Sequence, residues 1–88
     1  MTANRILSAK QWEILNHLVR ANPDGTWLDF DQLLERCSYR PSKESMHFSL
    51  RALVNRGLIE KKPTEFRRGA NRRVLAPTAL AFEKCRTD

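Results

Sequence analysis

The segment LRALVNRGLIEK, residues 50–61, contains the end of a helix and the start of a strand. Apolar residues three and four positions apart line one side of the helical part: Met46, Leu50, Leu53 and Val54. Gly57 stands where the left-handed residue after a helix end is expected, because glycine adopts positive φ without strain. We therefore predict a helix that begins at Pro41 or Ser42, ends before Gly57 and is followed by strand.

The residues after this helix predict a hairpin. Strands are expected over residues 58–62 and 73–76, joined by a loop over residues 63–72. Gly69 and Asn71 suit the turn, since both residue types tolerate positive φ. The loop and its flanks are rich in cations, so the hairpin is also the most basic part of the chain.

A first helix is predicted before this unit. Ser8 and Gln11 have the spacing of a capping box, in which the hydroxyl and the amide satisfy each other's backbone N–H groups. The sequence Asn-Pro-Asp-Gly at residues 22–25 ends the helix, because proline disfavours a helical residue before it. Residues 26–28 then predict a short strand with a single bridge.

Two further helices complete the pattern. Asp29 and Gln32 repeat the capping spacing and predict a helix that ends near residues 36–37. Thr78 caps a last helix over residues 79–86, with three residues expected to face the core: Leu80, Ala81 and Cys85. The order is helix, short strand, helix, helix, hairpin, helix. It describes one small α+β domain over residues 1–88, with a core between about residues 7 and 86.

The net positive charge is confined to the second half of the chain. Sixteen Lys and Arg oppose ten Asp and Glu, which gives a net charge of +6. Residues 1–44 hold six basic and six acidic side chains, whereas residues 45–88 hold ten and four. This asymmetry indicates a polyanionic partner that contacts the C-terminal half, although a basic soluble protein without such a partner has the same composition.

Several function classes find no support in the sequence. No apolar run is long enough to span a bilayer, and the N-terminus lacks the apolar stretch of a signal peptide, so we expect a cytoplasmic protein without a membrane partner. The four Cys and His residues show no spacing typical of a metal site, so no metal or cofactor is expected: His17, Cys37, His47 and Cys85. No catalytic spacing or glycine-rich phosphate loop occurs, which argues against an enzyme.

The chain resembles the winged helix-turn-helix superfamily, most closely its multiple-antibiotic-resistance-regulator (MarR) type, from Leu7 to Leu80. The most specific piece is Leu-x-x-Leu-Val-x-x-Gly-Leu-Ile-Glu-Lys at residues 50–61, which in the family ends the recognition helix and opens the wing. The resemblance implies a recognition helix over residues 42–56 and a wing over residues 61–73. It also implies binding to double-stranded DNA, since this is the common activity of the superfamily.

The sequence departs from the family in two ways. The family dimerises through long terminal helices that frame a ligand pocket, whereas here six residues precede Leu7 and the last helix has about two turns. We therefore expect no small-molecule effector, and a homodimer only through a smaller surface, such as one containing Phe82. The recognition helix is also about two residues longer at its start than in the family.

The exposed side of the predicted recognition helix carries hydrogen-bonding and cationic side chains suited to the major groove: Ser42, Lys43, Glu44, His47 and Arg51. Lys43 and Ser42 stand where the helix dipole favours a phosphate, and Arg51 suits a guanine edge or a phosphate. Glu44 fits a cytosine amine or the neutralisation of Lys43. The alternative interpretation of this set is an ordinary solvated helix face.

The predicted wing holds six cations and one acid, Glu65, within thirteen residues. We expect it to clamp the minor groove or its phosphates with five of these side chains: Lys62, Arg67, Arg68, Arg72 and Arg73. Arg68 and Arg72 flank the predicted turn and are the best candidates for its tip. Two or three of the six cations, which include Lys61, are expected to be ordinary strand residues facing water.

Tyr39 and Arg40, in the turn before the recognition helix, are further candidates for contacts to the DNA backbone. Together these features predict a DNA-binding transcriptional regulator of prokaryotic, phage or plasmid type that associates with the nucleoid. Two alternatives stay open at this point. One is a winged-helix module that binds an acidic protein within a larger complex, and the other is an RNA-binding protein.

Overall fold

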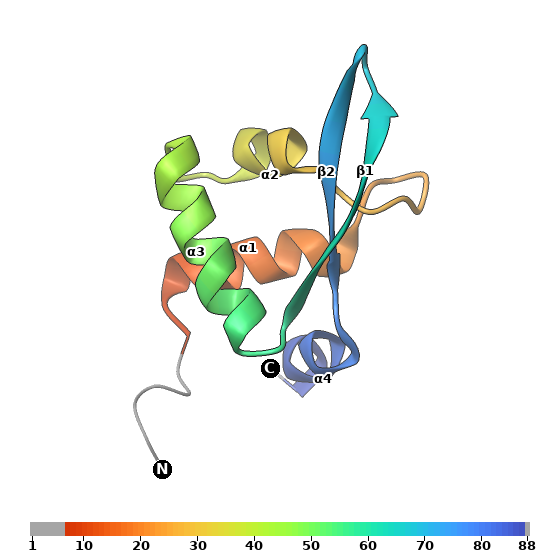
Figure 1. Cartoon of the computed structure of the whole chain (residues 1–88). Coiled ribbons are helices and arrows are strands. Elements are labelled where there is room, and N and C mark those ends of the chain that lie inside the picture. Colours follow the sequence, from red (N-terminus) through yellow and green to blue (C-terminus); the bar gives the residue numbers. More distant parts are fainter. Residues whose placement is uncertain (1–6, 88) are drawn as a thin grey trace.

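The computed structural model describes residues 7–87, which form four helices and one antiparallel hairpin (Figure 1). The elements are α1 (Ala9–Arg20), α2 (Phe30–Arg36), α3 (Lys43–Asn55), β1 (Ile59–Arg67), β2 (Ala70–Pro77) and α4 (Ala79–Thr87). The predicted α+β class and the order of the elements are thereby confirmed. Within the described residues, no helix combines the length and the apolar character needed to cross a membrane.

Local capping interactions fix the helix starts, as predicted. Ser8 Oγ accepts from the Gln11 amide at 3.1 Å, and Gln11 Oε1 accepts from the Ser8 amide at 3.0 Å. Asp29 and Gln32 make the same reciprocal pair at the start of α2. Gly57 follows α3 with φ +76°, in the left-handed region where glycine is unstrained.

The core lies between α1, α2, α3 and the base of the hairpin. Its fully buried side chains include Ile14, Leu15, Leu18, Leu28, Leu33, Met46, Leu50, Leu53, Leu58 and Leu75. α4 contributes Ala81, and Cys85 packs against the core one turn later. Leu80 is 42% exposed, so its predicted inward position is wrong. Ala81, about 100° further around the helix, is the residue that faces the core, and this rotation places Leu80 toward solvent.

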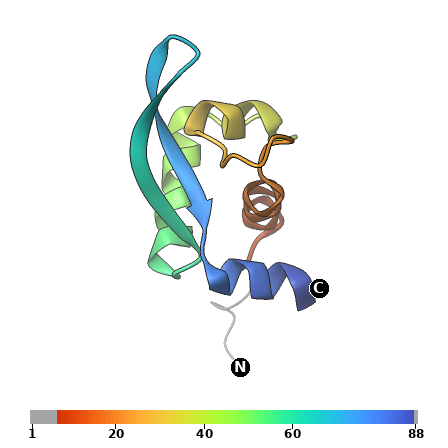
Figure 2. The same ribbon diagram turned by 90° about the vertical axis from the view of Figure 1, so that its right-hand side faces the viewer.

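The hairpin is longer and its turn tighter than predicted. β1 continues to Arg67 and β2 begins at Ala70, so the expected loop over residues 63–72 is mostly paired strand. The turn consists of Arg68 and Gly69 at φ 52° and 84°, the positive angles of a two-residue hairpin turn. Asn71 lies in β2. Both views show the hairpin tip projecting beyond α2 (Figures 1 and 2).

A bulge interrupts the hairpin at its middle. Lys61 pairs with Leu75 and Thr64 with Arg73, so β1 has one extra residue in this interval. Pro63 lies there, where a missing N–H does not break the ladder. The edge of β2 that faces away from β1 meets the segment before α2, through a bridge between Val74 and Asp29. The strand with a single bridge that was predicted over residues 26–28 thus corresponds to a bridge one residue later, at Asp29.

Candidate nucleic-acid interface

The exposed side of α3 carries the predicted polar residues. Lys43, Glu44, His47 and Arg51 are all exposed, and the Ser42 hydroxyl caps the helix by accepting from the Ser45 amide at 3.1 Å. The His47 ring stacks on Phe30 of α2, with centroids 4.4 Å apart and planes 18° from parallel. This stacking orients the imidazole at the edge of α3 that faces the hairpin.

A hollow of about 370 Å³ separates α3 from the hairpin. It is lined by polar and charged side chains from α3, both strands and α2: His47, Lys61, Asn71, Arg72 and Arg73, with one acid, Asp31, which pairs with Arg72. Its apolar lining comes from Phe30, Leu50 and Leu75. Residues from α3 and from both strands therefore face one concave surface, although they are up to 28 positions apart in the sequence.

Two of the predicted wing arginines turn back toward α2. Arg68 Nη2 lies 3.1 Å from the Asp29 carboxylate, and Arg67 Nη1 lies 3.5 Å from it. Arg67 also donates to the Trp27 carbonyl at 2.8 Å and pairs with Glu65 at 2.9 Å. Its side chain is only 16% exposed. These two guanidinium groups hold the outer part of the hairpin to the start of α2.

Arg72 is bound in the same way. It pairs with Asp31 of α2, and its Nε donates to the Arg67 carbonyl at 2.8 Å. Lys62 pairs with Glu60 at 3.1 Å, and Arg73 donates to the Lys62 carbonyl at 2.8 Å while remaining exposed. The hairpin cations are thus of three kinds. Arg67, Arg68 and Arg72 link to Asp29 and Asp31 at the start of α2, and Lys62 pairs with Glu60 within β1. Lys61 and Arg73 are exposed beside the hollow.

Asp29 is the acid to which both Arg67 and Arg68 bind. Its side chain is fully buried, and it accepts from the Gln32 amide at 2.9 Å as well as from the arginines. Burial acts to raise the pKa of this carboxyl. The hydrogen bonds from Arg68 and Gln32, together with the charges of Arg68 and Arg67, outweigh burial and hold the pKa below its usual value. Asp29 is therefore ionised at neutral pH.

This lowered pKa predicts acid sensitivity. A carboxyl group with a lower pKa in the folded than in the unfolded state stabilises the fold above its unfolded pKa, about 4. That contribution is lost as the pH falls through the folded pKa. We expect the free energy of unfolding, measured by urea titration, to drop below about pH 4. In Asp29→Asn the drop should be shallower, and equal slopes in both proteins would contradict the assignment.

Tyr39 and Arg40, in the turn before α3, differ in their exposure. Arg40 is exposed with φ 52° and is available for a surface contact. Tyr39 packs against the core, and Lys10 lies over its ring at 5.1 Å. Burial raises the pKa of Tyr39 to about 12, with smaller effects from Cys37 and Glu13. Its buried hydroxyl does not reach the surface, so Tyr39 no longer counts as a candidate backbone contact.

Two exposed aromatic side chains were not predicted as part of the site. Phe48 is 72% exposed and Phe66 is 74% exposed. Phe48 lies between Glu44 and Arg51, four and three residues away, and so shares their face of α3. The sequence contains an indication of Phe48, because this residue lies outside the apolar stripe of the helix, where a phenylalanine gains nothing from core packing.

The comparisons with known proteins give no family. Neither the models of known protein families nor the curated protein sequences include a match to this chain.

Proposed function

We propose that the protein is a winged-helix domain that binds double-stranded DNA, with α3 in the major groove and the hairpin as its wing. The bridge between Asp29 and Val74, which joins the hairpin to the segment before α2, supports this layout. So does the α2–turn–α3 unit with its polar outer face. The proposal includes the MarR-like resemblance and a role in transcriptional regulation.

The observation that carries the proposal is the shared concave surface between α3 and the hairpin. His47 from α3 and Lys61 and Arg73 from the strands line it, and Arg51 is exposed on the adjoining face of α3. A duplex needs cations on both sides of a seated helix, because its phosphates flank the groove. In this arrangement Arg51 reads base edges, while Lys61 and Arg73 contact phosphates.

Phe48 has a place in the same proposal. It lies on the outer face of α3 beside Arg51, and a major groove offers the methyl group of thymine as an apolar contact. Glu44, on the same face, is suited to the amine of cytosine. The mixture of an apolar, an acidic and a basic side chain favours sequence preference over uniform phosphate binding.

Salt dependence tests the function directly. We expect the protein to bind a labelled duplex of random sequence in a fluorescence anisotropy titration. With the two phosphate contacts proposed for Lys61 and Arg73 the log–log salt slope should be roughly −2, since each contact contributes about −0.9. Structured RNA added as competitor should displace the duplex poorly. Absence of binding at low salt, or stronger competition by RNA, would refute the proposal.

A protein-interaction module is the second candidate, and the exposure of Phe48 and Phe66 favours it. Aromatic residues are enriched at the centres of protein interfaces, where their burial supplies much of the affinity. Such a module would bind all duplexes equally and weakly. A clear preference among duplexes, selected from random sequences, separates the DNA reader from this alternative.

A further inference from the structure

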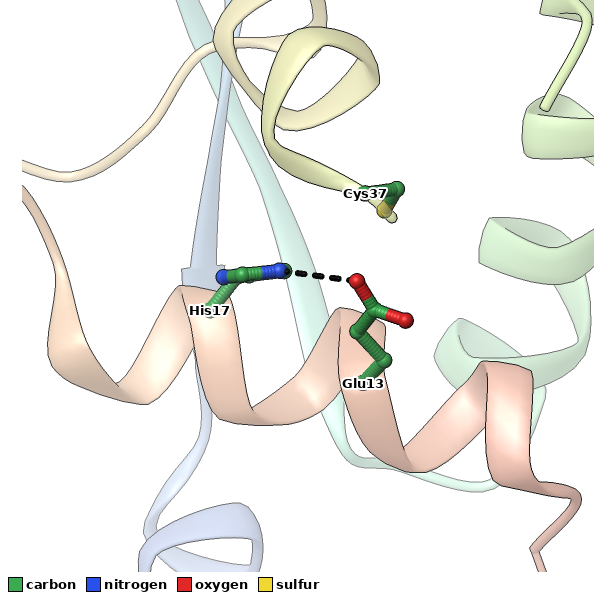
Figure 3. A group of neighbouring side chains, drawn as sticks. All are labelled: Glu13, His17 and Cys37. Atoms are coloured by element: carbon green, nitrogen blue, oxygen red, sulfur yellow. Dashed lines mark hydrogen bonds and ion pairs between the residues drawn. The ribbon is translucent and has the colours of Figure 1, made fainter. Parts of the chain in front are cut away.

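A second group of reactive side chains lies where α1 meets the end of α2 (Figure 3). Glu13 and His17 are one helical turn apart on α1 and point to the same side, toward Cys37 at the end of α2 (Figure 3). His17 Nε2 is 3.2 Å from Glu13 Oε2. The nitrogen, oxygen and sulfur atoms of the three residues all lie within 4.8 Å of one another.

The chemistry of these donors matches one class of metal ion. Imidazole, carboxylate and thiolate together are ligands of Zn²⁺ and similar divalent transition metals, while Mg²⁺ and Ca²⁺ prefer oxygen alone. Ligand atoms about 2.0–2.3 Å from a tetrahedral ion are themselves roughly 3–4 Å apart. The observed separations reach 4.8 Å at most, so small side-chain rotations close the site.

The Glu13 carboxylate is already oriented by Ser38. The Ser38 amide donates to Glu13 Oε2 at 2.6 Å, and the Ser38 hydroxyl donates to Oε1 at 2.8 Å. Hydrogen bonds of this kind fix the ligands of metal sites and raise their affinity. A carboxylate oxygen accepts more than one interaction, so Oε2 can keep the Ser38 amide and exchange His17 for an ion.

Tyr39 provides an independent observation beside the thiol. Its hydroxyl is the one buried side-chain oxygen or nitrogen, among the residues described by the structure, that lacks a hydrogen-bond partner. Unpaired buried polar groups are costly and call for an explanation. Tyr39 is two residues from Cys37, and its hydroxyl lies close enough to the Cys37 side chain to interact with it. A metal-bound thiolate is a stronger acceptor than a thiol, so an ion at Cys37 would strengthen this contact and give the phenol a full hydrogen bond.

Access to the group is from the solvent side of α1. Cys37 is 1% exposed, whereas the side chains of Glu13 and His17 are 26% and 23% exposed. A surface hollow lined by Trp12, Asn16 and Arg20 adjoins both residues. An ion entering there meets the carboxylate and the imidazole first, and one coordination position remains open to water.

We propose that Glu13, His17 and Cys37 form a binding site for Zn²⁺ or a similar divalent transition-metal ion. The Cys37 thiol proton passes to solvent as the sulfur–metal bond forms. The site is independent of the DNA-binding proposal and revises the expectation of no metal, which considered only Cys and His. A bound ion would fasten α1 to the turn that precedes α3.

Titration of the reduced protein with Co²⁺ tests the site. We expect the near-ultraviolet charge-transfer band of a cobalt–thiolate bond and the visible bands of tetrahedral cobalt. Zn²⁺ should displace Co²⁺ and abolish both. Cys37→Ser should remove the charge-transfer band. His17→Gln should weaken affinity about 100-fold or more, because loss of even an outer hydrogen-bond partner costs 10–100-fold.

The chain supplies matched controls, since it has two cysteines and two histidines. Cys85→Ser and His47→Gln remove the same ligand types elsewhere and should bind Co²⁺ as the unsubstituted chain does. The proposal is overturned if no thiolate band forms, if the band persists in Cys37→Ser, or if the controls lose it equally. If Cys37→Ser does not fold, His17→Gln on the half-exposed face of α1 decides the question.

Discussion

Asp29→Ala is expected to lower the free energy of unfolding by about 3 kcal/mol or more. Two causes act together. The substitution removes the carboxylate that Arg67 and Arg68 share, and breaking a fully buried ion pair costs about 3–5 kcal/mol. The lower end applies here, because Arg68 is 45% exposed and Arg67 keeps its pair with Glu65. The substitution also removes the cap of α2, worth roughly 1 kcal/mol. Urea unfolding followed by circular dichroism measures the sum.

The neighbouring acid provides the control. Asp31 pairs with Arg72, but its side chain is 36% exposed, so Asp31→Ala should cost less than about 1 kcal/mol. Asp29→Asn keeps an acceptor for the Gln32 amide and removes only the charge. Its decrease in the free energy of unfolding should therefore lie between those of Asp29→Ala and Asp31→Ala. If Asp29→Ala were as mild as Asp31→Ala, the hairpin would not depend on the buried carboxylate.

The second large effect concerns duplex binding, and it rests on the proposed function. Arg51→Ala combined with Arg73→Ala should weaken affinity about 100-fold at low salt, since a base-reading arginine is worth roughly 1–3 kcal/mol. The loss of Arg73 alone should act equally on all sequences and reduce the salt slope by about one. Arg51→Ala alone should also flatten the preference among duplexes.

Arg20→Ala serves as the matched control for these variants. It removes an exposed arginine from the last turn of α1, which contributes no residue to the hollow between α3 and the hairpin. Measured beside Arg73→Ala at about 0.15 M salt, its affinity should stay within about twofold of the unsubstituted protein, because the Debye length there is about 8 Å and Arg20 makes none of the proposed phosphate contacts. An equal loss in Arg20→Ala and Arg73→Ala would mean that net charge, and not this surface, determines binding.

The helices could be predicted because their signals are local. Capping pairs such as Ser8 with Gln11 span three residues, and Gly57 marks the end of α3 by its own backbone preference. The outer hairpin could not be predicted in this way. Both of its faces are solvated there, so Thr64, Glu65 and Phe66 are all exposed and no apolar alternation marks the strand.

The residues of the candidate interface could be predicted from the sequence, but their ion-pair partners could not. The exposed face of α3 follows from helical periodicity, and Arg51 lies on it as expected. The roles of Arg67 and Arg68 depend on Asp29, which is 38 and 39 residues earlier. A count of charges within the predicted wing, residues 61–73, finds only Glu65 as an acid. For the same reason Glu13, His17 and Cys37 show no pattern until α1 and α2 are packed together.

The bulge at Lys62 and Pro63 has a consequence for how the protein behaves at high concentration. Among residues 7–87, β1 pairs with β2 alone, so its other side is an open edge that another chain could extend into a larger sheet. Proline offers no N–H to an incoming strand, and the extra residue twists the edge out of register with one. Lysines at positions 61 and 62 add charge repulsion between copies. The bulge thus hinders the edge-to-edge association of β1 with other copies of the chain.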